Sequence, residues 1–222
     1  MELLAFGDTG WGDELFRATL MTIAVSITAM IIGFSFAAIF TPLKLSKFKS
    51  LNLIANIYTT VIRGVPELLV IYLFFFGGSG AIMFVASMFG YNEYIEINAF
   101  LTGSFAIGII SGAYSTEVFR GAIQSIDKGQ FEASFSLGMT KTYTWLKVIF
   151  PQALKIVIPP LIGTIISIFK ATAILSVLAI NDVMRAAQRI SSYTFKPVEV
   201  YTTAAFLAFF VGLMITLAGQ AI

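Results

Sequence analysis

Residues 15–40 read LFRATLMTIAVSITAMIIGFSFAAIF, an apolar run in which Arg17 is the single charged side chain. A helix needs roughly 20 apolar residues to cross the hydrocarbon core of a bilayer. The run is therefore long enough to form a membrane-spanning helix. Thr41 and Pro42 follow it, and we expect them to end the helix because proline lacks the amide hydrogen that a helix interior needs.

Four further stretches have the same apolar character. They lie at residues 51–76, 99–119, 155–180 and 200–222. Of the 222 residues, 58% are hydrophobic and 12% are charged, whereas soluble domains carry about 25% charged residues. The sequence thus predicts an all-α membrane protein, with about five transmembrane helices in one domain over residues 1–222.

Cysteine and histidine are both missing from the chain. Their absence excludes a disulfide framework, a thiol nucleophile and a Cys/His zinc site. It also excludes a Ser-His-Asp catalytic triad. We therefore expect a chain that holds no metal and is not an enzyme.

The distribution of basic residues predicts the orientation, since lysine and arginine accumulate on the cytoplasmic side. Eight of them lie between spans one and two or between spans three and four: Lys44, Lys47, Lys49, Arg120, Lys128, Lys141, Lys147 and Lys155. Residues 77–98, expected to form an outer loop, have none. Arg185, Arg189 and Lys196 disagree, but the majority predicts an outer N-terminus and an inner C-terminus. No basic flank follows the last span at Ile222, which suggests a further short tail.

Small residues recur at intervals of four in two of the predicted spans. Ala29, Gly33 and Ala37 have this spacing in the first span, and Ser104, Gly108 and Gly112 have it in the third. Such spacing lets helix backbones approach closely within lipid. We interpret these residues as packing positions of a helical bundle.

The segment from Phe119 to Ile158 interrupts the apolar pattern for longer than a simple turn requires. Loops above about 12–15 residues are usually functional or disordered, and the many aromatic residues of this one argue against disorder. We expect one or two short cytoplasmic helices around Gly138. An apolar stripe on such helices needs a partner groove, or it rests on the membrane surface.

Within this segment, residues 132–134 read Glu-Ala-Ser, Gly138 follows, and residues 149–151 read Ile-Phe-Pro. The series resembles the EAA loop of ABC-importer permeases, with Ser134 in place of the second alanine. Other segments are similar to the polar amino acid branch of that family: RGVP at 63–66, GAYSTEVFRG at 112–121, and KATA at 170–173 with Asn181-Asp182 after it. The resemblance covers about residues 15–220, in order.

The resemblance implies the transmembrane permease subunit of a type I ABC importer in the inner membrane. In that family the loop, here residues 120–154, forms a coupling helix that docks on an ATP-binding subunit. The matching positions are Glu132, Ala133, Ser134 and Gly138. The implied partners are a dimer of ATP-binding subunits, a second permease that is identical or homologous, and an external solute-binding protein. ATP then binds to the partner, and this chain lacks the Gly-x-x-x-x-Gly-Lys-Ser/Thr loop that would hold it.

Charged residues at membrane depth are costly, so each is a candidate functional residue. Arg63 lies about 18 Å from the basic loop by helical rise, which places Arg63 and Glu67 near the midplane. Gly64 and Pro66 interrupt the helix between them, and an interrupted helix exposes backbone groups to a substrate. Alternatively, Arg63 pairs with Glu67 one helical turn away or contacts a neighbouring helix.

Lys170 lies inside the fourth span, with Thr172 and Ser176 nearby. One cation and two hydroxyls suit the α-carboxylate of an amino acid. Two other interpretations stay open: Lys170 bonds carbonyls freed by Pro159 and Pro160, or it extends toward the membrane surface.

Two more carboxylates stand at the ends of spans, Glu117 in the third and Asp182 after the fourth. With Glu67, they suit a cationic ligand. An acidic residue directly after RGVP resembles permeases for arginine, histidine and opines, so we expect basic amino acids or opines as substrates. Alternatively, Glu117 pairs with Arg120, and Asp182 caps a following helix.

Two other functions compete with the importer. A secondary active amino acid transporter would need coupling-ion sites and usually two repeated halves, and the sequence displays neither. A membrane scaffold without transport activity would tolerate neutralisation of Glu67 and Asp182. The long segment 119–158 favours the importer, because only the importer needs to dock an ATPase.

Overall fold

A computed structural model describes residues 5–7, 10–91, 98–178 and 180–220. Their secondary structure is helical throughout, joined by turns and short extended links. The α-helices are α1 (Gly12–Lys44), α2 (Lys49–Gly64), α3 (Glu67–Tyr72), α4 (Gly78–Met88), α5 (Ala99–Gln124), α6 (Lys128–Ser136), α7 (Lys141–Thr144), α8 (Phe150–Ala171), α9 (Val183–Thr194) and α10 (Pro197–Gln220). The π-helical segments Leu73–Gly77 and Trp145–Ile149 and the 3-10 segment Thr172–Leu178 continue α3, α7 and α8.

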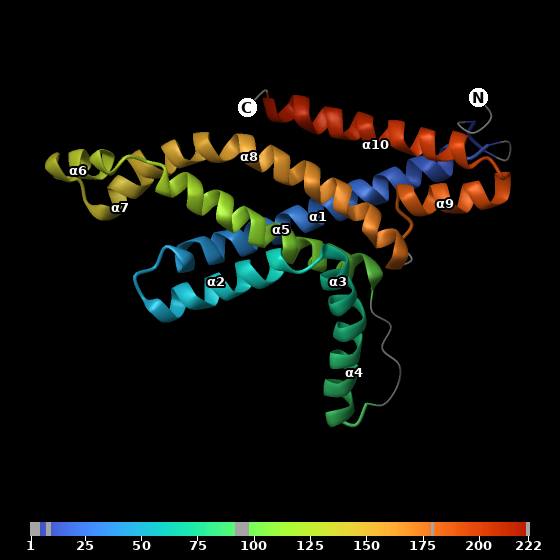
Figure 1. Ribbon diagram of the computed structural model, residues 1–222, viewed down its shortest axis with the longest axis horizontal. Coiled ribbons are helices and arrows are strands. Elements are labelled where there is room, and N and C mark those ends of the chain that lie inside the picture. The colour runs from blue at the N-terminus through green and yellow to red at the C-terminus, as the bar shows by residue number, and fades with distance from the viewer. Residues whose placement is uncertain (1–4, 8–9, 92–97, 179, 221–222) are drawn as a thin grey trace.

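Five helical stretches among the described residues are long and apolar enough to cross a membrane. They are Gly12–Lys44, Glu67–Met88, Ala99–Gln124, Lys141–Leu178 and Pro197–Gly219. This confirms the predicted all-α membrane fold. In Figure 1, α1, α5, α8 and α10 run along the long axis of the molecule, whereas α3 and α4 project crosswise from its middle.

The closest helix packing joins α1 to α5 through the small residues that the spacing predicted. A Cβ added to Gly108 would lie 2.6 Å from Cγ2 of Ile32 and 3.2 Å from the carbonyl oxygen of Ala29. One added to Gly112 would lie 3.1 Å from the carbonyl oxygen of Gly33. Since backbone faces backbone at these points, larger side chains have no room. The packing interpretation is confirmed for these residues.

The second predicted span, 51–76, is not one helix. Helix α2 ends at Gly64, Val65 is extended with φ −98° and ψ 138°, and α3 begins at Glu67. Pro66 explains the break, because its ring excludes Val65 from the helical region. The chain then stays helical to Met88, so residues 78–88 are helix rather than the expected outer loop. Glu93 and Glu96 of that expected loop lie outside the described residues.

The first predicted span ends later than expected. Helix α1 continues through Pro42 to Lys44. Pro42 removes one backbone N–H donor from the last turn of the helix. Two other bonds still close this turn, from Leu45 N to Thr41 O (3.1 Å) and from Ser46 N to Leu43 O (3.2 Å). The extra turn brings Lys44 within hydrogen-bond distance of Thr59 on α2. Residues 221–222 of the last predicted span lie outside the described residues.

The segment 119–158 contains the expected short helices, α6 and α7. Gly138 separates them with a φ of 75°, a conformation that glycine adopts without steric cost. A small apolar cluster around Ile149 and Ala153 holds the pair, and the rings of Phe131 and Trp145 meet edge to face at 5.8 Å within it. The two helices form one end of the molecule (Figure 1).

Helix α9 lies at the opposite end of the molecule (Figure 1). Asp182 begins it as N-cap, and its Oδ1 accepts a bond of 2.9 Å from the backbone N–H of Arg185. This confirms the capping interpretation of Asp182. The apolar side of α9, including Ala186 and Ile190, packs with Leu15 and Ala18 of α1.

Candidate functional site

A polar cavity of about 470 Å³ lies between α3, α5 and α8. Glu67 lies at its α3 side, as the first residue after the Val65–Pro66 break. Its other polar side chains are Ser111 and Tyr114 from α5 and Thr164 and Ser167 from α8. Because most of the surrounding wall is aliphatic, these five side chains determine what the cavity can bind.

The room for this cavity comes from small residues on one face of α8. Pro160, Gly163, Thr164, Ser167 and Ala171 all line it, and their spacing of one, three or four residues places them along one side of a helix. A Cβ on Gly163 would meet no atom within 4 Å. The sequence analysis missed these residues, although small and hydroxyl residues at helical spacing within an apolar span were a usable signal.

Arg63 does not line this cavity but contacts the ring of Tyr114, which does. Its guanidinium carbon lies 5.2 Å from the ring centre of Tyr114, within the range of a cation–π interaction. Among the described ion pairs, none joins Arg63 to Glu67. The helical spacing that would bring them together is lost at Val65. The contact of Arg63 with a neighbouring helix is thus the alternative that the structure contains.

A second, smaller cavity of about 270 Å³ brings together three of the predicted residues, Lys170, Thr172 and Asp182. Thr22 of α1 and Tyr201 of α10 also line it. Lys170 makes no hydrogen bond or ion pair with any described residue, so its bonding to carbonyls near Pro159 and Pro160 is not observed. Lys170 and Asp182 therefore both contribute to the wall of one cavity, whose surface is almost wholly apolar.

Asp182 is almost completely buried, with 2% of its surface exposed. Burial raises the pKa of this carboxyl to about 6, although hydrogen bonds from backbone amides at the start of α9 act in the opposite direction. The carboxyl therefore gains or loses its proton within a mildly acidic range.

The hydroxyls predicted beside Lys170 have internal partners. Thr172 donates to the carbonyl of Phe169 at 2.7 Å, and Ser176 donates to that of Ala173 at 2.8 Å. The carbonyl of Ser176 also accepts a bond of 2.8 Å from Arg185. Ser176 does not line the Lys170 cavity, so the structure does not unite the predicted trio of Lys170, Thr172 and Ser176.

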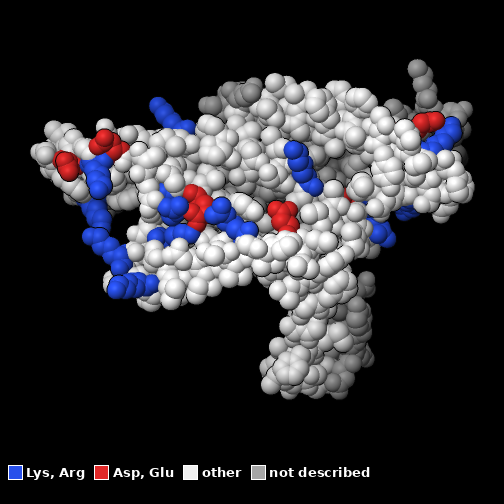
Figure 2. Space-filling view, in the orientation of Figure 1, with Lys and Arg blue, Asp and Glu red and all other residues white. Residues whose placement is uncertain are grey.

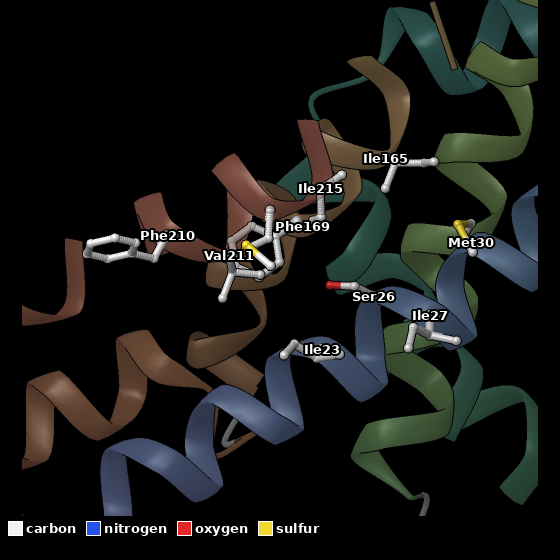
Figure 3. Close-up of a pocket in the computed structure, with 10 residues that line it drawn as sticks. Ile23, Ser26, Ile27, Met30, Ile165, Phe169, Phe210, Val211 and Ile215 are labelled. Atoms are coloured by element: carbon white, nitrogen blue, oxygen red, sulfur yellow. The ribbon is translucent and has the colours of Figure 1, made fainter. Parts of the chain in front are cut away.

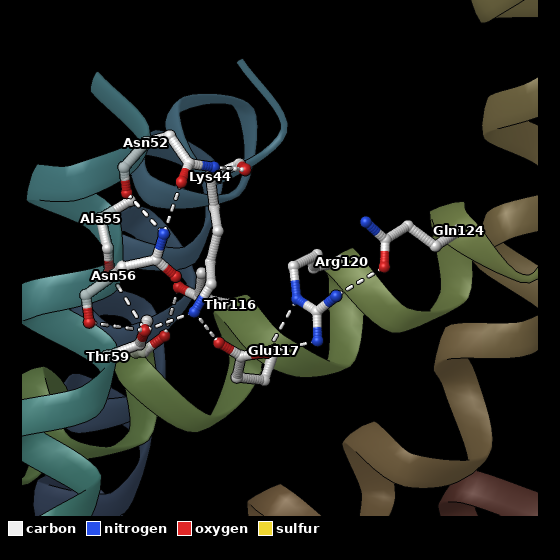
Figure 4. Close-up of polar contacts among 10 residues, drawn as sticks. Lys44, Asn52, Ala55, Asn56, Thr59, Thr116, Glu117, Arg120 and Gln124 are labelled. Carbon is white, nitrogen blue, oxygen red and sulfur yellow. Dashed lines mark hydrogen bonds and ion pairs between the residues drawn. The ribbon is translucent and has the colours of Figure 1, made fainter. Parts of the chain in front are cut away.

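Glu117 lies in neither cavity but in a network with residues of α1 and α2 (Figure 4). It accepts bonds from Lys44 of α1 and from Nε of Arg120, the latter at 2.8 Å. Lys44 also donates to the hydroxyl of Thr59 on α2 at 2.5 Å. The expected pairing with Arg120 is present, and the sequence analysis missed Lys44. The positive-inside rule could have found it, because it places both Lys44 and Glu117 at the inner surface.

The four residues predicted to contact an ATPase differ in exposure. Glu132, Ala133 and Gly138 are exposed, whereas Ser134 is buried and donates to the carbonyl of Gln130 at 2.7 Å. Leu137 between them is 82% exposed. Figure 2 shows charged side chains of both signs around this end of the molecule. Ser134 thus contributes to the packing of α6, and the others form its outer surface.

A third cavity, of about 460 Å³, opens between α1, α8 and α10 (Figure 3). Its walls are aliphatic and aromatic, apart from Ser26. The hydroxyl of Ser26 donates to the carbonyl of Thr22 at 2.7 Å. This cavity suits hydrocarbon and offers nothing to orient a polar molecule.

Comparison with known proteins gives a consistent result. Residues 29–222 match the family described as binding-protein-dependent transport system inner membrane component. The octopine transport system permease OccQ of Rhizobium meliloti is 41% identical, over 93% of this chain and 87% of the relative. The nopaline permease NocQ of Agrobacterium fabrum is 41% identical, over 92% and 87%. The arginine permease ArtQ of Haemophilus influenzae is 32% identical, over 87% and 84%.

Solved structures agree. A crystal structure of an amino acid ABC transporter with histidines superposes with a TM-score of 0.82 and 33% identity, over 95% of this chain and 93% of that one. The methionine ABC transporter MetNI, in an inward-facing conformation, superposes with a TM-score of 0.72 at 16% identity, over 97% of each chain. The second likeness concerns the fold alone.

Proposed function

This chain belongs to the family of inner membrane components of binding-protein-dependent transport systems, and we propose that its substrates are basic amino acids or opines. It is a multi-pass permease subunit of an ABC importer in the inner membrane. The relatives named for octopine, nopaline and arginine support this substrate class. The observation that carries the proposal within this chain is the carboxylate of Glu67 beside the central polar cavity.

The chemistry of that cavity suits a cationic side chain. A carboxylate at membrane depth attracts an ammonium or guanidinium group, and both would otherwise be costly in lipid. Ser111 and Thr164 donate to the carbonyls of Gly108 and Pro160, so their oxygens remain as acceptors for such a cation, and the Ser167 hydroxyl can orient polar atoms next to it. The volume of about 470 Å³ falls in the usual range of sites for small molecules.

The second cavity offers a separate candidate site for such a molecule. Lys170 suits an α-carboxylate, and Asp182 suits an α-ammonium group. The two cavities open on different faces of α8 and its 3-10 extension, because Ile168 and Ala171 line the first and Phe169, Lys170 and Thr172 line the second. We place Glu67 on the substrate path and propose Lys170 as a separate contact for a carboxylate.

Energy for transport comes, in this proposal, from ATP bound by a separate subunit. The surface formed by Glu132, Ala133, Leu137 and Gly138 at the α6–α7 end docks on that subunit. Leu137 on this surface is exposed, and the bound ATPase would supply an apolar partner for it. Ser134 supports this surface from inside. A second permease chain completes the path, and an external solute-binding protein delivers the substrate.

Uptake by proteoliposomes tests the role of Glu67. The complex is assembled with its ATPase, permease partner and binding protein, and uptake of labelled arginine and octopine is measured. Glu67→Gln keeps the shape of the side chain and removes its charge, so we expect uptake of both guanidinium-bearing substrates to be lost while the complex still assembles. Glu199→Gln, at an exposed carboxylate on α10, serves as the control. Equal uptake by Glu67→Gln and the control would refute the assignment of Glu67.

A further inference from the structure

Three polar side chains at the central cavity have no hydrogen-bond or ion-pair partner among the described residues: Arg63, Glu67 and Tyr114. Glu67 and Tyr114 line the cavity, and the guanidinium of Arg63 lies over the Tyr114 ring, 5.2 Å from its centre. In contrast, the carboxylates of Glu117 and Asp182 both accept hydrogen bonds from within the chain. Charged groups at membrane depth are costly unless they are paired, so Arg63 and Glu67 lack a partner that the chain itself does not supply.

The break between α2 and α3 keeps these two opposite charges apart. Arg63 is the last residue but one of α2, which ends at Gly64, and Glu67 is the first residue of α3. On an unbroken helix, opposite charges four positions apart are neighbours and pair with each other. Val65 is extended instead, with φ −98° and ψ 138°. Both charges therefore stay available to a molecule that carries one charge of each sign.

Arg63 is suited to bind an anion at the edge of the cavity. Its side chain is exposed, and the ring contact holds it beside the cavity wall without using its N–H donors. A guanidinium presents five such donors in a planar fork that matches a carboxylate. The hydroxyl of Tyr114 can donate to the same group. Since no lysine or arginine occurs among the described residues that line the cavity, Arg63 supplies the positive charge next to it.

We infer that Arg63 and Tyr114 bind the carboxylate of a molecule whose cationic side chain lies at Glu67. This inference rests on the proposed function, in which Glu67 takes the cation. It adds a requirement for a carboxylate, which basic amino acids and opines carry and the amines formed by their decarboxylation lack. Because the Lys170 cavity opens on a different face of α8, the carboxylate of a molecule at Glu67 belongs to Arg63 rather than to Lys170.

Binding of three related ligands tests the inference. The permease and ATPase chains are purified as a complex without the binding protein, whose own selectivity would otherwise contribute. Calorimetry then gives the Kd for arginine, for agmatine, which is arginine without its carboxylate, and for citrulline, in which a neutral urea replaces the guanidinium. Arg63→Met removes the charge at similar side-chain length. Since it removes hydrogen bonds to a charged group, we expect about 10- to 100-fold weaker binding of arginine and citrulline and unchanged binding of agmatine.

Two further variants make the test specific to the fork of Arg63. Arg17 on α1 is also an exposed arginine that has no partner among the described residues, so Arg17→Met should leave all three Kd values unchanged. Arg63→Lys keeps the charge but not the planar fork, and should weaken arginine binding less than Arg63→Met does. If Arg63→Met fails to assemble, Arg63→Lys must still weaken arginine more than agmatine, and equal effects on both ligands would overturn the inference.

The ligand pairs also separate this inference from the proposed function. Unchanged arginine binding by Arg63→Met would overturn the inference, and so would an equal loss of agmatine binding, because a packing role through Tyr114 affects both ligands alike. Glu67→Gln should weaken arginine and agmatine but spare citrulline. If it weakened none of them, or all three alike, the assignment of the cation to Glu67 would fail even where Arg63→Met behaves as expected. A wild-type complex that binds none of the three would refute both.

Discussion

Lys44 at the end of α1 pairs with Glu117 on α5, two residues that are 73 positions apart in the chain. Both side chains are largely shielded, with 10% and 17% of their surfaces exposed. Arg120 binds the other oxygen of the same carboxylate at 2.8 Å, and Lys44 also reaches Thr59 of α2. The Glu117 carboxylate and its partner Lys44 therefore connect α1, α2 and α5 at the end of the bundle from which the α6–α7 segment extends.

Replacing Lys44 by methionine should destabilise the protein. The change removes one of two cationic partners from a shielded carboxylate, and an under-satisfied buried acceptor costs about 2 kcal/mol. Thermal unfolding in detergent measures the loss. Lys47→Met, at an exposed lysine in the same loop, should have almost no effect, and adding Glu117→Gln to Lys44→Met should restore part of the stability. Equal melting temperatures for the two single variants would contradict the structural role of the pair.

A methyl group at Gly108 should loosen the contact between α1 and α5. The added Cβ would meet Ile32 at 2.6 Å and the backbone of Ala29 at 3.2 Å, and the backbone cannot yield without moving the helix. We expect Gly108→Ala to cost about 1–3 kcal/mol, as overpacking usually does. Gly212→Ala on α10, where no atom lies within 4 Å, is the control and should stabilise slightly through its better helix propensity. Equal melting temperatures of the two variants in the same detergent assay would contradict this packing.

The stability of the protein should fall as pH rises across the titration of Asp182. Its pKa is about 6 in the folded chain, above the ordinary value of about 3.9, so the folded state binds the proton more tightly than the unfolded state. The associated stability is present below pH 4 and is lost as pH rises through about 6.

Melting temperatures measured between pH 4 and pH 7 check this effect. Asp182→Asn keeps an N-cap side chain and removes the titration, so the decline should become smaller in that variant. Asp182→Ala should lower stability by about 1 kcal/mol at every pH through loss of the cap. An unchanged decline in Asp182→Asn would assign the pH dependence to other groups.

The outer surface of the α6–α7 segment should be needed to retain the ATPase. Glu132→Arg combined with Gly138→Trp reverses a charge and forces a bulky residue into a backbone conformation with φ 75°. We expect the co-expressed ATPase to be lost on purification, while the chain itself remains folded. Glu199→Arg with Gly212→Trp introduces the same residue types on α10, within regular helix, and should retain the ATPase. Retention by both double variants would show that the ATPase docks elsewhere.

The orientation in the membrane can be measured directly because the chain contains no cysteine. Single cysteines at Lys47 and at Tyr193 lie at opposite ends of the bundle, in the α1–α2 loop and in α9. The positive-inside rule predicts that a membrane-impermeant maleimide labels the Tyr193→Cys variant in intact cells. The Lys47→Cys variant should react only after lysis, and the reverse pattern would invert the predicted topology.

The sequence was sufficient for those features that depend on neighbouring residues. Apolar length alone indicates a membrane helix, and the intervals of four between small residues identified packing positions; the structure shows that α1 and α5 meet at them. The break beside Pro66 was visible for the same reason, since a proline ring acts on the residue before it. The sequence did not show how far the helix continues after this break. It reaches Met88, whereas the span was expected to end at residue 76.

By itself, the sequence determined the membrane class, the helical fold, the two short helices around Gly138 and the list of charged residues that membrane depth makes costly. Only the tertiary structure decided how those charges are distributed. It set Glu67 in one cavity and Lys170 with Asp182 in another, and it bound Glu117 to Lys44 outside both. The physical reason is that helix formation depends on residues within a few positions of each other, whereas each of these polar sites is assembled from helices that meet only when the whole chain has packed.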